Sequence, residues 1–110
     1  MSKMTKIFST IALSTLATGA YANQCETVRF ADVGWTDITA TTAVTSELLK
    51  GLGYKTKTDL LSVPVTYSSM ANGDIDIFLG NWMPTMEGDI AKYRDAGTVE
   101  NVRGNVVGAK

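Results

Sequence analysis

Residues 26–38 read ETVRFADVGWTDI, and this stretch decides the fold. β-Branched and aromatic side chains fill residues 26–33 over the length of a strand, and Gly34 ends the run. From Asp37 onward the apolar residues repeat at helical spacing, so a strand gives way to a helix, with Trp35 at the junction. A strand that leads into a helix favours an α/β arrangement.

The following residues predict a long helix and a return strand. The helix covers 37–52, because apolar side chains recur there on one face. Thr36 or Asp37 can cap its start, and Gly51 or Gly53 can end it. Residues 54–61 alternate as in an exposed strand. The apolar residues of the helix are Ile38, Val44, Leu48, Leu49 and Leu52.

The same alternation continues to about residue 96. A short helix over 62–70 opens on Pro64, which a first helical turn tolerates. A third strand follows over 75–79, and a third helix over 85–96 places Met86, Ile90 and Tyr93 on one face. The order βαβαβα predicts an α/β fold, in which a parallel sheet has flanking helices and right-handed crossovers.

Both tryptophans of the chain follow a strand and a glycine. The first motif is DVGW, ending at Trp35, and the second is FLGNW, ending at Trp82. The carboxyl ends of parallel strands lie on one edge of a sheet, where ligands bind at a switch of strand order. With the strand order 2-1-3, the two indoles face the same crevice. A purely structural alternative is that each ring plugs one end of the core.

Two classes of ligand suit a pair of indoles. Sugar rings stack on tryptophan, and quaternary ammonium groups are held by aromatic faces because they cannot donate hydrogen bonds. Asp37 lies two residues after the first ring and would place a negative charge near a cation, in addition to its possible role at the helix start.

Other chemistry is poorly supported by the residues present. The chain contains no histidine, which excludes histidine-dependent triads and histidine metal sites within it. Glu87 and Asp89 lie two apart on the third helix and point to different faces, while Asp74 and Asp76 flank a strand start as solvated edge charges. There is no glycine-rich phosphate loop. We therefore expect no enzyme, no metal and no cofactor.

The N-terminus predicts export. Lys3 and Lys6 precede a short apolar run that ends in Ala20-Tyr21-Ala22, a small-residue cleavage pattern. A cleavable signal peptide over 1–22 would leave eight basic and eleven acidic residues, a net charge of −3, which argues against nucleic acid as a partner. Cys25 has no cysteine partner in the chain, and we give it no catalytic role.

Two longer stretches resemble a known family. FADVGWTDITATTAVTSELLKGLGY (30–54) and VPVTYSSMANGDIDIFLGNWMPT (63–85) are similar to the substrate-binding proteins of choline and glycine betaine ABC importers, above all to the choline-binding branch. Members of this family have two α/β lobes that close like a clam-shell around the ligand, the type II periplasmic binding protein architecture. The resemblance makes residues 23–110 the first lobe, truncated before the second, and the remaining box residues would follow Lys110.

The resemblance also implies a function. Trp35 and Trp82 match tryptophans of the aromatic box that holds the trimethylammonium group, and Asp37 matches the acidic residue beside the first. The protein would bind choline or a related quaternary amine in the periplasm and deliver it to a membrane permease without catalysis. Alternative interpretations are an exported enzyme or a carbohydrate-binding protein with tryptophan stacking subsites, and a structural domain in which the rings only plug the core.

Overall fold

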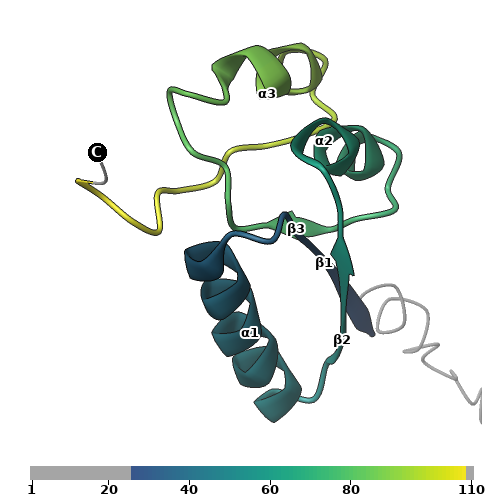
Figure 1. The fold of residues 1–110 in the computed structure, drawn as a ribbon. Helices are drawn as coiled ribbons and strands as arrows, with labels where there is room; N and C mark the ends of the chain where they lie inside the picture. Colours follow the sequence, from purple (N-terminus) through teal and green to yellow (C-terminus); the bar gives the residue numbers. More distant parts are fainter. Residues whose placement is uncertain (1–25, 109–110) are drawn as a thin grey trace, which may run out of the picture.

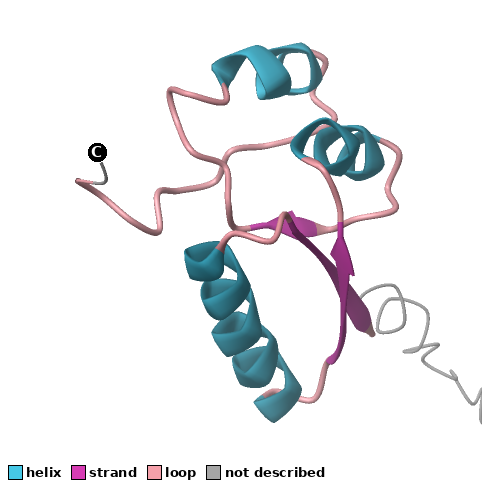
Figure 2. Cartoon of the chain, in the orientation of Figure 1, coloured by secondary structure: helices cyan, strands magenta, loops and turns pink. Residues whose placement is uncertain are grey.

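The computed structural model describes residues 26–108. The predicted signal peptide and Cys25 lie outside these residues. Three strands and three helices alternate along the chain, as Figures 1 and 2 show. They are β1 (Thr27–Asp32), α1 (Thr36–Gly51), β2 (Lys55–Leu60), α2 (Val63–Ala71), β3 (Ile77–Phe78) and α3 (Glu87–Asp95).

The strands form a parallel sheet in the order β2-β1-β3. β1 is the central strand and pairs with β2 along its whole length, from Thr27 opposite Lys55 to Asp32 opposite Leu60. β3 pairs with the other side of β1 over two residues. The predicted α/β class and the parallel sheet are therefore confirmed, and the observed strand order is the one that makes β1 and β3 neighbours.

The two groups of helices occupy different parts of the fold. α1 lies alongside β1 and β2, while α2 and α3 pack against each other near β3 (Figure 1). The main cluster of the hydrophobic core lies between α2, α3 and β3, in addition to the buried Phe30 and Ala31 of β1 and Ile75. Its buried members are Tyr67, Met86, Ile90 and Val99, and Phe78, Met83 and Tyr93 are among the partly buried residues that pack against them. The predicted apolar face of the third helix is thus confirmed.

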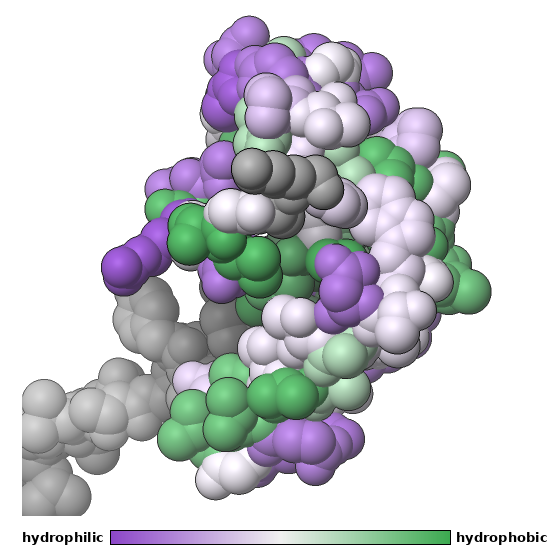
Figure 3. All heavy atoms as spheres, turned by 60° about the vertical axis from the view of Figure 1, so that its left-hand side comes forward, coloured by the Kyte–Doolittle hydropathy of each residue, from purple (hydrophilic) through white to green (hydrophobic). Residues whose placement is uncertain are grey.

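The apolar arc of α1 is only partly buried, which differs from the prediction. The buried residues of this helix are Thr42 and Ser46, whose small side chains face inward. Ile38 and Leu49 are half-buried, since they lie at the inner edge of the broad apolar arc. The outer edge of the arc is exposed on the side of the molecule that Figure 3 brings forward. It consists of Val44, Leu48 and Leu52.

Several element ends differ from the prediction. β3 contains only Ile77 and Phe78: the backbone N–H of Asp76 still donates to the Arg29 carbonyl of β1, but the N–H of Arg29 donates to the Asp76 carboxylate and not to a backbone carbonyl. α3 begins at Glu87 and not at residue 85, because residues 83–86 form a turn. The predicted cap of α1 was wrong: Trp35 occupies the N-cap position, and no side chain caps it. Gly53, with φ +96°, follows the last turn as expected.

No helix within residues 26–108 has both the length and the apolar character needed to cross a bilayer.

One ion pair ties the amino end of the sheet together. The Asp76 carboxylate accepts hydrogen bonds from the backbone N–H of Arg29 at 2.8 Å and from its Nε and Nη2 atoms at 3.0 and 2.7 Å. These bonds, led by those from the guanidinium, lower the pKa of Asp76 below its ordinary value of 3.8. Asp76 is therefore a paired charge at this edge and not the purely solvated one that the sequence suggested.

We expect this pair to give a small, pH-dependent stabilisation. Because the folded pKa of Asp76 is depressed, its contribution is present above pH 3.8 and is lost as the pH falls through the lowered folded value. At pH 7, Asp76→Asn should lower Tm by about 2–4 °C, the size expected for a partly screened pair in a small domain. Thermal unfolding followed by circular dichroism measures this. Asp74→Asn is the control, and an equal loss in both variants would contradict the assignment.

Candidate functional site

The register of the sheet brings the two tryptophan loops together. Ala31 of β1 pairs with Phe78 of β3, and each tryptophan lies four residues beyond its member of this pair. Both loops therefore leave the same edge of the sheet, at the carboxyl ends of adjacent strands. β2 lies on one side of β1 and β3 on the other, so the direction in which successive strands are added changes here. α/β folds bind ligands at such a switch point.

The indole rings of Trp35 and Trp82 contact each other edge to face. Their centroids are 6.3 Å apart and their planes form an angle of 72°. Steeply inclined rings present two adjacent walls, and a cation can lie within the roughly 6 Å range of cation–π attraction from both rings at once. The structure thus brings together the two aromatic side chains that the sequence selected.

Neither indole fills the core. Trp35 is 38% exposed and Trp82 is 43% exposed, whereas the side chains of the core are nearly inaccessible. This exposure argues against the interpretation of the rings as core plugs.

The two glycines before the tryptophans act in different ways. Gly34 has φ +81°, a left-handed conformation that glycine adopts without strain, and it permits the turn as predicted. Gly80 is buried and is needed for space. A Cβ atom there would lie 2.7 Å from the Phe78 ring and 3.1 Å from Ile38 Cγ1, so a side chain would collide with the Phe78 ring.

Asp37 lies in the first turn of α1, exposed, at the edge that holds the indoles. Its carboxylate does not cap the helix, since no side chain does so. The uncapped amino end of a helix has a partial positive charge of roughly +0.5, which the full negative charge of Asp37 more than offsets. The edge is therefore electrostatically suited to a cation.

Two buried polar groups beneath the loops were not among the predicted site residues. Asp32 accepts hydrogen bonds from the backbone N–H of Gly34 and from the hydroxyl of Thr39. Tyr67 of α2 donates its hydroxyl hydrogen to Asn81 Oδ1. Nothing in the spacing of the sequence connects residue 67 with residue 81. The order Asp-Val-Gly at the end of β1 could have indicated Asp32, because aspartate commonly accepts a bond from the N–H two residues later.

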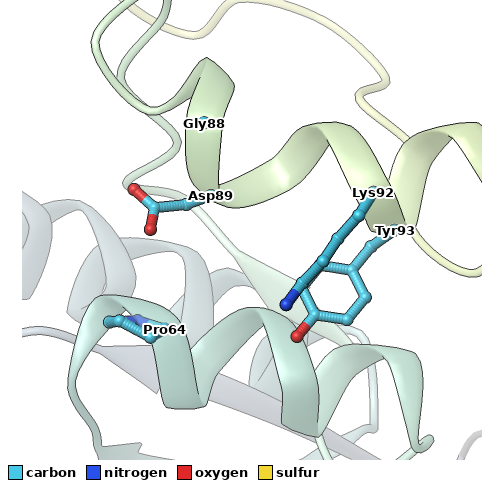
Figure 4. A pocket seen from close by; sticks show the side chains of 5 residues that line it. All are labelled: Pro64, Gly88, Asp89, Lys92 and Tyr93. Carbon is cyan, nitrogen blue, oxygen red and sulfur yellow. The ribbon is translucent and has the colours of Figure 1, made fainter.

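The carboxylates of α3 belong to neither loop. Glu87 forms an ion pair with Arg94, whose hydrogen bonds lower the pKa of Glu87. Asp89 points toward α2 across a cavity of about 110 Å³, in which Lys92 lies beside Tyr93 with its Nζ atom 4.8 Å from the ring centroid (Figure 4). Glu87 and Asp89 thus face different surroundings, as the sequence predicted. Pro64 and Gly88 complete the cavity.

A larger, shallow apolar hollow lies on α1, lined by Ala43, Val44, Glu47 and Leu48. Neither this hollow nor the cavity between α2 and α3 includes an indole. The ring pair is an open corner and not an enclosed pocket. Within the described residues, no group of three potential metal ligands comes together.

Comparison with known proteins places this geometry in context. Residues 26–110 match the family model described as the substrate binding domain of ABC-type glycine betaine transport systems. A curated relative from Chromohalobacter salexigens, an uncharacterized protein called ORF1, is 52% identical over 91 residues, which are 83% of this chain and 59% of that protein.

Two solved structures are similar as well. One is an ABC-transporter choline-binding protein in complex with choline, 67% identical with a TM-score of 0.71 over 72% of this chain and 27% of that one. The other is an ABC-transporter choline-binding protein in an unliganded semi-closed conformation, 65% identical with a TM-score of 0.70 over 76% and 29%. The chain thus spans less than two thirds of each of these relatives.

We expect the space at Gly80 to be required for the fold. Gly80→Ala should destabilise the protein by about 1–3 kcal/mol, because the added methyl group overpacks the contact with the Phe78 ring, which also packs edge to face with the Tyr67 ring. Gly88→Ala is the matched control: nothing lies within 4 Å of a Cβ there, and alanine favours the helix. Urea unfolding of both variants measures the difference. Equal stability of the two variants would show that the Phe78 ring moves aside without cost and would contradict this expectation.

Proposed function

The chain belongs to the family of substrate-binding domains of ABC-type glycine betaine transport systems, and from this premise we propose that it binds choline or a closely related quaternary amine for an ABC importer. The observation on which the proposal depends is the pair of exposed indoles 6.3 Å apart at the carboxyl edge of the sheet. The 67% identity to a choline-binding protein solved with choline supports the same assignment.

The chemistry of the ligand matches this corner. A trimethylammonium group has a full charge but no N–H hydrogen, so hydrogen-bond acceptors alone cannot select it. The faces of Trp35 and Trp82 can attract it, with each contact contributing about 0.5–2 kcal/mol and more once water is excluded. As an open corner, the ring pair leaves part of such a cation in water. We therefore expect the 110-residue chain alone to bind weakly.

The charge of Asp37 favours choline over glycine betaine in this proposal. Both ligands have the same cationic head, so the indoles attract them equally. Betaine also has a carboxylate, which Asp37 repels, whereas choline has a neutral hydroxyl. Ligand selection would then depend on Asp37 and on groups from outside the two tryptophan loops.

The remaining parts of the proposal follow from the family. The matching family and solved structures are transport binding proteins and not enzymes, and we assign no reaction to this chain. Residues 1–22 would act as an export signal, residues 23–110 would form part of the first lobe, and the working location would be the periplasm. The partner would be the membrane permease, which receives the ligand after the lobes close around it.

A hybrid protein tests the role of the indoles. In it, residues 26–108 of this chain replace the matching segment of the 67%-identical choline-binding protein. We expect choline binding in calorimetric titration, weakened about 10- to 30-fold by Trp35→Ala or Trp82→Ala, because each change removes one desolvated cation–π contact. Tyr54→Ala is the matched control, since this tyrosine is 41% exposed but lies before β2, at the opposite edge.

The same titrations separate the alternatives. Binding of a neutral sugar, with no heat from choline or glycine betaine, would reject the quaternary-amine assignment in favour of sugar stacking. Choline binding that both tryptophan variants leave unchanged would place the ligand elsewhere.

The role of Asp37 has its own test in the hybrid. Asp37→Asn should weaken choline binding by about three- to fivefold, the effect of one partly screened charge at contact range. The affinity for glycine betaine should fall less, so the ratio of the choline affinity to the betaine affinity decreases. Asp59→Asn on β2 is the control. Equal losses for the two ligands, or no loss for choline, would contradict a selective role for this carboxylate.

A further inference from the structure

The exposed indoles need other groups to hold them in position. Trp35 and Trp82 stand on separate loops, and burial in the core fixes neither ring. Their edge-to-face contact contributes only about 0.5–1.5 kcal/mol beyond the area it buries, too little to immobilise two loops by itself. The angle between the rings must therefore be set from beneath, by groups that hold the backbone on each side of them.

The loop of Trp35 is held by a buried carboxylate. Asp32 is 8% exposed and has no cationic partner within residues 26–108. A buried charge is costly unless hydrogen bonds satisfy it, and Asp32 accepts two. One comes from the N–H of Gly34 at 2.8 Å and the other from the hydroxyl of Thr39 at 2.7 Å. These donors lie before and after Trp35, so one carboxylate holds both sides of the ring-bearing turn.

The loop of Trp82 is held by a buried hydroxyl. Tyr67 is 1% exposed, and its hydroxyl donates to Asn81 Oδ1 at 2.6 Å. Its oxygen also lies 3.2 Å from the sulfur of Met86. That sulfur accepts the N–H of Trp82 at 3.3 Å, and the N–H of Met86 donates to the Trp82 carbonyl at 2.9 Å. The hydroxyl thus contacts a residue on each side of the second ring.

The Tyr67 hydroxyl stays protonated at physiological pH. Burial, and then the charge of Asp89, raise the pKa of Tyr67 to about 12. The hydroxyl can therefore donate to Asn81 across the neutral and mildly alkaline range. The two loops share one design, in which a buried polar group on a regular element bonds to the residue just before the tryptophan and contacts a second residue after it.

We propose that the Asp32 carboxylate and the Tyr67 hydroxyl are positioning groups that set the angle and separation of the two indoles. Neither group is required to touch the ligand. The consequence for ligand affinity rests on the proposed function, whereas the consequence for ring geometry does not.

Circular dichroism of the 110-residue chain tests the geometry without any ligand. Two indoles in contact at a fixed oblique angle produce an exciton couplet in the far ultraviolet. Trp35 and Trp82 are the only tryptophans in the chain, so an indole couplet reports this pair alone. We expect the couplet in the unmodified chain and its loss in Tyr67→Phe and in Asp32→Asn, with cooperative thermal unfolding retained.

Matched controls separate positioning from general packing. Tyr93→Phe removes a hydroxyl from another tyrosine at the same core, and Asp59→Asn neutralises a carboxylate on β2. Both controls should keep the couplet. If Asp32→Asn fails to fold, Thr39→Val decides the question for that loop, since it removes one of the two bonds and leaves the charge. Tyr67→Phe keeps its ring in the core and decides the question for the other loop.

Each outcome is decisive. A couplet that persists in Tyr67→Phe and in Asp32→Asn or Thr39→Val would overturn the proposal, as would its absence from the unmodified chain. In the hybrid protein, the same substitutions should weaken choline binding by about 5- to 30-fold, the loss expected when one buried hydrogen bond no longer orients the site. If the unmodified hybrid does not bind choline, the proposed function fails, and the couplet still decides the positioning role.

Discussion

The parallel pairing of β1 with β3 is the constraint on which the candidate site depends. Because Ala31 lies opposite Phe78, equal lengths of chain lead from the paired residues to Trp35 and Trp82. A slip of one residue would move one loop along the strand direction by about 3.3 Å, more than half of the 6.3 Å between the rings. It would also turn every side chain of β3 to the opposite face of the sheet. Two residues of pairing therefore determine whether the indoles meet.

The polar groups that hold the two loops lie in different surroundings. Beside Trp82 they lie at the hydrophobic core, since Met86 is both a member of the core and a hydrogen-bond partner of the Trp82 backbone. Beneath Trp35 the support is a buried carboxylate between a turn and a helix. α1 has a polar inner face and an exposed apolar outer edge, so it contributes little core to its own end of the molecule. At that end of the molecule, hydrogen bonds and not burial hold the turn that bears Trp35.

Electrostatics complete the description of the edge. The carboxyl edge of a parallel sheet receives the amino ends of the following helices, and their partial positive charge favours anions. A cation site at such an edge needs a compensating negative charge. In the proposed function Asp37 would supply it from the first turn of α1, where no side chain caps the helix. Hydrogen bonds of its own compensate the second carboxylate of the same loop, Asp32.

The sequence by itself determined the α/β class, the family and the placement of the two tryptophans at the carboxyl ends of strands, whereas the structure decided the strand order that makes those strands neighbours. The first three follow from periodicity, from glycines at strand ends and from short motifs, which are local signals. The sequence did not determine which part of the apolar arc of α1 is buried, because that depends on how closely the helix approaches the sheet. Only the tertiary structure decided that Gly80 is needed for space and that Asp32 and Tyr67 lie beneath the rings. Residues 67 and 81 meet only when α2 packs beside β3, and no local pattern records such a contact.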